Sequence, residues 1–81
     1  MAPYRCYLLG ERAVVLELPP PASLAQQRRI WQLARQLRAA AAVREVVPGM
    51  NNLTALLHEP VRDTQPVLDW LTAQWQQTSA S

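Results

Sequence analysis

Hydrophobic and polar residues follow two different periods along this chain, and the changes of period divide it into six elements. YRCYLL and RAVVLEL are short strand-forming runs separated by Gly10 and Glu11, which is typical of a β-hairpin. VREVV and LTALLHE repeat the pattern around a five-residue connection, PGMNN. In that connection Pro48 cannot donate to a strand ladder, Gly49 tolerates positive φ and the asparagines favour a turn. The sequence therefore predicts two hairpins.

A helical period follows each hairpin. Ser23 and Gln26 form a capping box at the start of a helix predicted to run to about Ala41. Asp63 or Thr64 is expected to cap a second helix that has Pro66 in its first turn, and residues 77–81 are expected to form a frayed tail. The apolar stripes expected to meet the sheet are Ile30, Leu33, Ala34, Leu37 and Ala41 in the first helix, and Val67, Leu68, Trp70, Leu71 and Trp75 in the second.

The order ββαββα predicts a single α+β domain over residues 1–76. Its simplest packing is a two-layer sandwich, in which both helices lie on one face of a four-stranded antiparallel or mixed sheet. Because two helices cannot cover both faces, the other face is expected to be open.

Alternation at period two assigns the faces of three strands and leaves the third strand ambiguous. The residues expected to meet the helices are Cys6, Leu8, Val14, Leu16, Leu18, Leu53, Ala55 and Leu57. On the open face Tyr7, Leu9, Val15 and Leu56 alternate with Arg5, Glu17, Thr54 and His58. We expect position 15 to face water in the free domain, and we interpret Tyr7, Leu9, Val15 and Leu56 as candidate interface residues.

Composition supports a folded chain, since 49% of the 81 residues are hydrophobic and 17% are charged. No apolar run is long enough to span a bilayer, and neither the single cysteine nor the first residues indicate secretion. The expected location is therefore cytoplasmic.

Eight arginines against six acidic residues leave a formal charge of only +2, which is weak support for nucleic-acid binding. Three arginines, at positions 28, 35 and 38, nevertheless flank Trp31. The small charge favours a solvated helix face on which these arginines stack over Trp31, rather than a single-stranded nucleic-acid site. A protein contact at Trp31 is the third alternative, so Trp31 joins the candidate interface residues.

The residues do not indicate a reaction. Cys6 and His58 are predicted on opposite sheet faces, the carboxylates are dispersed, and the two glycines lie too far apart for one phosphate loop. We therefore predict no catalytic, cofactor-binding or metal-binding residue, and expect the chain alone to be inactive and not to bind ATP.

A family resemblance extends this interpretation. GER precedes AVVLEL at residues 10–18, a long helix follows, and EVVPG at 45–49 precedes a strand that ends in HEP at 58–60. In this order and spacing, residues 4–76 resemble the amino-terminal domain of the allophanate hydrolase subunit 1 family. That family includes PxpB, the B-type subunit of 5-oxoprolinase, and the kinase inhibitor KipI. The PGMNN turn is closest to the PxpB branch, whereas PPP at 19–21 replaces the usual glycine.

The resemblance implies a DCoH-like ββαββα plan within a longer parent protein, whose cyclophilin-like carboxy-terminal domain is absent from this chain. It also implies that the parent, with the C-type subunit of 5-oxoprolinase as its partner, hydrolyses 5-oxoproline to glutamate using ATP. The alternative is a KipI-like inhibitor of a sensor histidine kinase that acts as a dimerising module. The implied partners are the C-type subunit, the missing domain or a second copy, and neither nucleic acid nor a membrane.

Overall fold

The predicted element order is confirmed by the computed structural model, which describes residues 4–21 and 23–78. The elements are β1 (Arg5–Leu8), β2 (Ala13–Glu17), α1 (Leu24–Arg38), β3 (Val43–Pro48), β4 (Asn52–Leu57) and α2 (Thr64–Gln76). The four strands form one antiparallel sheet in the order β1-β2-β4-β3. The two hairpins therefore join through their second strands, and each hairpin supplies one edge of the sheet.

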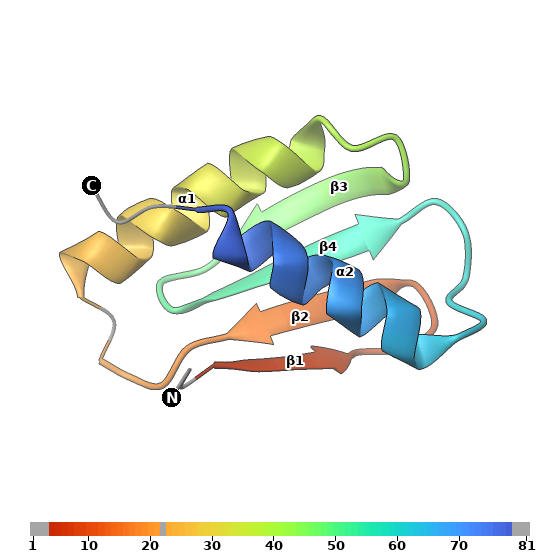
Figure 1. Ribbon diagram of the computed structural model, residues 1–81, viewed down its shortest axis with the longest axis horizontal. Helices are drawn as coiled ribbons and strands as arrows, with labels where there is room; N and C mark the ends of the chain where they lie inside the picture. The colour runs from red at the N-terminus through yellow and green to blue at the C-terminus, as the bar shows by residue number, and fades with distance from the viewer. Residues whose placement is uncertain (1–3, 22, 79–81) are drawn as a thin grey trace.

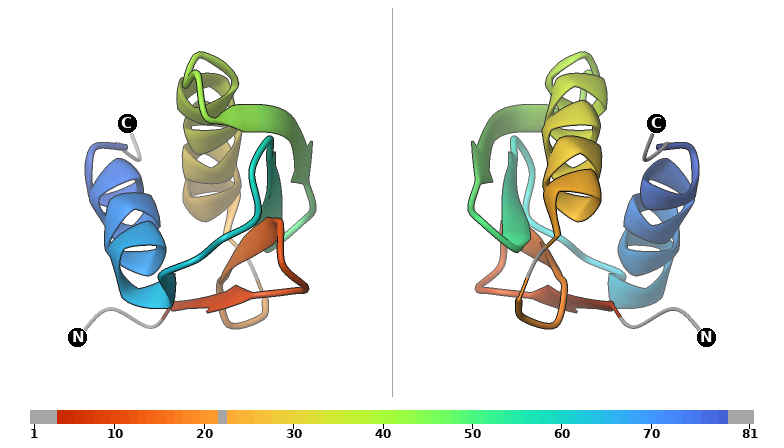
Figure 2. Two further views of the ribbon diagram at one scale, coloured as in Figure 1. Left: turned by 90° about the vertical axis from the view of Figure 1, so that its right-hand side faces the viewer. Right: turned by 90° about the vertical axis from the view of Figure 1, so that its left-hand side faces the viewer.

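Both helices lie on the same side of the sheet, as predicted (Figure 1). The end-on views show that neither helix reaches the other side (Figure 2). Helix α1 packs mainly on β3 and β4, whereas α2 packs on β1 and β2. The fold is a two-layer α+β sandwich with one uncovered sheet face.

The core lies between the sheet and the helices and follows the predicted alternation. Val14 and Leu16 of β2 are fully buried, as are Leu53 and Ala55 of β4. On β1 the core-facing side chains are only partly buried, because β1 is an edge strand and its outer side has no neighbouring strand. From α1 the core receives Ile30, Leu33, Ala34 and Leu37, and from α2 it receives Leu71 and Trp75.

Helix α1 starts as predicted and ends three residues early. The Ser23 hydroxyl accepts a hydrogen bond from the Gln26 amide at 3.1 Å, and the Gln26 side chain accepts one from the Ser23 amide, which completes the capping box. At the other end the amides of Ala39 and Ala40 donate to carbonyls three residues back, which tightens the last turn. Ala41 is consequently exposed and outside the helix, contrary to the prediction.

A bulge explains why the faces of the third strand are ambiguous in the sequence. Val43 pairs with Leu57 and Glu45 pairs with the adjacent Leu56, so Arg44 is an extra residue in β3. Val43 and Val46 consequently both face the core although they are three positions apart. Strict alternation fails in VREVV for this reason.

Polar side chains link α1 to α2. The Arg29 guanidinium lies 3.9 Å from the centroid of the Trp75 ring, and it donates to the Thr78 hydroxyl and the Trp75 carbonyl. Thr78 is buried, and Gln77 caps the carboxyl end of α2. Of the tail expected over residues 77–81, positions 79–81 lie outside the described residues.

Candidate interaction surface

The face of the sheet that points away from both helices, which we call the outer sheet face, is organised in rows across the strands. Register places Tyr7 beside Val15, Val15 beside Thr54, and Thr54 beside Val47. This central row crosses all four strands and contains no charge. The next row runs from Ala13 through Leu56 to Glu45.

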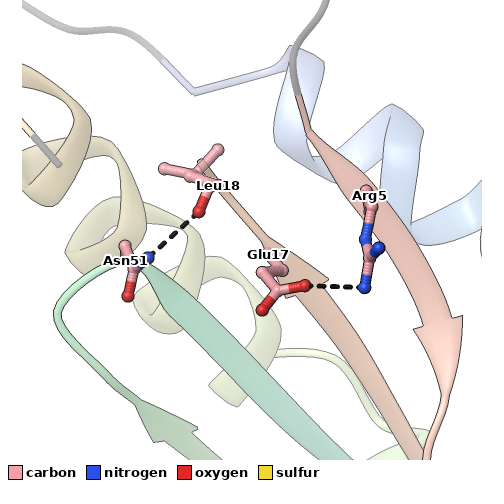
Figure 3. Close-up of polar contacts among 4 residues, drawn as sticks. All are labelled: Arg5, Glu17, Leu18 and Asn51. Atoms are coloured by element: carbon pink, nitrogen blue, oxygen red, sulfur yellow. Dashed lines mark hydrogen bonds and ion pairs between the residues drawn. The ribbon is translucent and has the colours of Figure 1, made fainter. Parts of the chain in front are cut away.

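One end of the outer sheet face is polar. The Arg5 guanidinium lies 3.0 Å from a Glu17 carboxylate oxygen (Figure 3). It also lies 5.4 Å from the centroid of the Tyr7 ring. Asn52 pairs with Glu17 in the same row. These exposed charges limit the apolar part of the face to its middle, where Tyr7 and Leu56 are half-buried.

Val15 lies on the predicted face, but the expectation that it faces water is wrong. Only 4% of its surface is exposed. Val15 is in a central strand, with Tyr7 on one side and Thr54 on the other. Directly opposite side chains on neighbouring strands lie close enough to touch, so Val15 is shielded from both sides without a second layer.

Leu9 and Val47 are the exposed apolar residues associated with this face. Leu9 lies one residue beyond β1, where its amide donates to the Ala13 carbonyl and continues the register of the hairpin. Val47 is 49% exposed at the other edge. Val47 is missing from the predicted set because the bulge at Arg44 removes the alternation that would have assigned its face.

Trp31 belongs to a different surface from the other four candidates. It lies on α1, in the helical layer, and is 53% exposed. The surrounding hollow is lined by Arg28, Arg35, Arg38 and Pro48, among others. The predicted stacking of arginines on Trp31 is not observed among the described residues, where arginines stack on Tyr7 and Trp75.

The PGMNN connection links β3 to β4, and its Asn51 is hydrogen-bonded to Leu18, which follows β2 of the other hairpin. The Asn51 side chain donates to the Leu18 carbonyl at 3.1 Å (Figure 3). The Leu18 amide donates in turn to the Asn51 carbonyl at 2.8 Å. Gly49 does not adopt positive φ; a Cβ there would instead overlap the Asn52 side chain. Asn51 therefore ties this turn to the end of β2, and Gly49 leaves room for the Asn52 side chain, so both residues have a structural role.

The histidine, cysteine and carboxylate side chains of the described residues do not form a cluster. Cys6 faces α2, where its sulfur lies 3.7 Å from the Thr72 hydroxyl, and burial raises the pKa of the thiol. His58 is exposed beyond β4, and its carbonyl accepts from Arg12. Across residues 4–21 and 23–78, no three His, Cys, Asp or Glu residues are placed to hold a metal ion. No helix in the same ranges is long and apolar enough to cross a membrane.

These features define a small α+β domain with an uncovered, partly apolar sheet face. The chain belongs to the family described as the carboxyltransferase domain, subdomain C and D, which matches residues 4–81. It is 47% identical over 76 residues to the B-type subunit of 5-oxoprolinase from Escherichia coli O157:H7, and 45% identical over 73 residues to the same subunit from Haemophilus influenzae. The resemblance to the PxpB branch is thereby confirmed.

The matches cover most of this chain but only part of each relative. They include 94% and 90% of the chain, and 35% and 34% of the two relatives respectively. The chain thus spans about a third of the length of these relatives. Their shared name describes each of them as a subunit of 5-oxoprolinase.

Proposed function

We propose that this chain is the amino-terminal association domain of a PxpB-like subunit of 5-oxoprolinase. With the C-type subunit as its partner, the parent protein would hydrolyse 5-oxoproline to glutamate using ATP. The observation that carries the proposal is the outer sheet face, whose uncharged central row ends at the half-exposed Val47. Both relatives are named as subunits of that enzyme, which supports the choice of reaction.

The outer sheet face is suited to a contact through its side chains rather than to the addition of a strand at an edge. At one edge, β3 carries a bulge at Arg44 and ends in Pro48, which has no amide hydrogen. At the other edge, β1 is only four residues long. Short, bulged and proline-bearing edges are poor templates for a further strand.

The size of the face argues for a contact shared with other parts of the assembly. Four strands ~4.8 Å apart and five residues long at ~3.4 Å each project an area of roughly 330 Å². A stable interface buries about 800 Å² on each partner, so this face would supply less than half of one. In the proposal, the cyclophilin-like domain or the C-type subunit covers the face, and the ATP site and hydrolytic groups lie outside this chain.

The test uses the parent protein that contains this domain, co-purified with the product of a neighbouring gene and assayed for 5-oxoproline-dependent ATP hydrolysis. Val47→Arg adds a charge to the central row at an exposed position. We expect it to weaken assembly and activity by at least tenfold, because an unpaired charge buried in an interface is costly. Ala73→Arg adds the same charge on the exposed side of α2 and should leave both unchanged.

Two results would refute the proposal. The first is normal assembly and activity of the Val47→Arg parent. The second is a parent that lacks 5-oxoproline-dependent ATP hydrolysis and instead suppresses the autophosphorylation of a sensor histidine kinase, which is the KipI-like activity.

A further inference from the structure

Helix α1 presents a second surface, which we call the α1 stripe and define as Leu24, Arg28, Trp31, Arg35 and Arg38. All five side chains are exposed. Their spacings of four, three, four and three residues place them within about 80° of the helix circumference, over a length of about 21 Å. This spacing is that of the seam along which one helix packs against another.

The rest of the domain leaves the α1 stripe uncovered. The side of α1 that meets the sheet consists of Ile30, Leu33, Ala34 and Leu37. The side that meets α2 carries Arg29 and Gln36, which bond to residues 74–78. The α1 stripe therefore faces neither the core nor α2. Pro48 of β3 borders the hollow around Trp31.

The charge of the α1 stripe restricts its partner. Its three arginines form no ion pair within the described part of the chain, where Arg5 and Glu17 form the one such pair. Burying these guanidinium groups against an uncharged surface would cost their hydration without replacement. The apolar anchors are Trp31, 53% exposed, and Leu24, 59% exposed. Tryptophan and arginine are the residue types that most often dominate binding energy at protein interfaces.

We propose that the α1 stripe docks an acidic amphipathic helix of a partner protein. Carboxylates of that helix would pair with Arg28, Arg35 and Arg38, and its aliphatic residues would pack on Leu24 and Trp31. Opposite charges across a helix seam set the partner and its orientation. This contact does not depend on the proposed enzymatic function.

Two other occupants fit the α1 stripe less well. In a two-fold dimer through α1 the same patch meets itself, so arginine would face arginine. Exposed acidic residues such as Glu59, Asp63 and Asp69 do not share the spacing of the arginines, so another surface of a second copy is not complementary either. A single-stranded nucleic acid needs a groove that follows its backbone, whereas here two of five positions are apolar and the chain carries only +2.

The experiment titrates the 81-residue chain with a designed three-heptad peptide helix that carries glutamate at a and leucine at d. Binding is followed by calorimetry and by the indole N–H resonance of Trp31, which is assigned with Trp31→Phe. We expect this resonance and those of the stripe arginines to shift. Arg35→Glu should weaken binding at least tenfold, and a peptide in which only the glutamate that faces position 35 is lysine should restore binding to that variant.

Arg44→Glu is the matched control, because Arg44 is an exposed arginine on β3 and is not in the α1 stripe. Equal losses in Arg35→Glu and Arg44→Glu would show attraction to net charge and overturn the proposal. So would equal binding of the lysine and glutamate peptides to the unaltered chain. If a thymidine oligonucleotide bound more tightly at Trp31 than the glutamate peptide, the partner of the α1 stripe would be a nucleic acid. If the chain self-associated and Arg35→Glu abolished this, the partner would be a second copy. Either result would overturn the proposal.

Discussion

At the scale of single residues, Val15 shows that the face of the sheet on which a side chain lies does not determine its exposure to water. It points away from both helices, yet Tyr7 and Thr54 enclose it within the sheet. We expect Val15→Arg to lower the free energy of unfolding by about 2 kcal/mol or more, because a charge would replace a buried apolar group.

Urea denaturation followed by circular dichroism measures this change. Val47→Arg lies in the same row but is half-exposed, so it should stay within about 1 kcal/mol of the unaltered chain. Equal midpoints for the two variants would contradict the shielding of Val15 by its neighbours.

Ser23 is a second residue whose contribution can be isolated. Its hydroxyl accepts from the Gln26 amide, and the Ser23 amide donates to the Gln26 side chain, which completes the box. Ser23→Ala should reduce stability by about 0.5 to 2 kcal/mol through the unsatisfied amide. Ser23→Asp retains an acceptor and should keep most of the stability. A denaturation midpoint that is the same for Ser23→Ala as for the unaltered chain would rule out this role for the cap.

Cys6 gives a prediction about pH. Burial disfavours the thiolate and raises the pKa above its ordinary value of 9.0, while the hydrogen bond with Thr72 acts in the opposite direction. Over pH values just above 9 the folded chain thus holds a proton that the unfolded chain has lost. The resulting contribution to stability is complete below that ordinary value and is lost as the pH rises through the folded pKa.

Alkylation of Cys6 by iodoacetamide reports this shift, because the thiolate is the reacting form. The pH at which the alkylation rate is half of its maximum should be higher in the native chain than in the chain unfolded in urea. Identical values in the two states would show that burial does not raise the pKa of the Cys6 thiol.

At the scale of elements, helix pairing depends on polar residues that the amphipathic pattern assigns to solvent. Arg29 is on the flank of α1, yet it covers the Trp75 ring and donates to the Trp75 carbonyl and to Thr78. Arg29→Ala should lower stability by about 1.5 to 3 kcal/mol, the usual range for hydrogen bonds from a charged donor in a partly buried site.

Arg28→Ala is the matched control, since Arg28 is the neighbouring residue on α1 and is exposed. It should change the free energy of unfolding by no more than about 0.5 kcal/mol. Chemical denaturation of both variants is the measurement. If the two lose equal stability, the contacts of Arg29 do not hold α1 against α2.

At the scale of the whole molecule, the outer sheet face and the α1 stripe lie in different layers of the sandwich. The fold could therefore engage two partners through side chains that do not overlap. Val47→Arg should leave the titration of Trp31 with the glutamate peptide unchanged, within a factor of about two in affinity. A larger change in calorimetry would show that the two surfaces are coupled.

Local signals in the sequence were sufficient to predict the order of elements, the start of α1 and the core faces of β1, β2 and β4. These signals are the spacing of apolar residues, the capping box and the turn residues, which act over a few positions. The family likeness was also readable from the order of short motifs. Alternation likewise placed Tyr7, Val15 and Leu56 on one face, because it needs no knowledge of neighbouring strands.

The remaining features arise only when distant segments meet in the folded chain. Pairing between β2 and β4 shields Val15, the bulge at Arg44 places Val47 on the outer sheet face, and α2 draws Arg29 to Trp75. The end of α1 is also set by tertiary structure, since alanines 39–42 favour continuation of the helix while β3 must begin at Val43. Trp31 stays exposed, and the arginine of α1 that stacks on an aromatic ring is Arg29, which lies on the flank that meets α2.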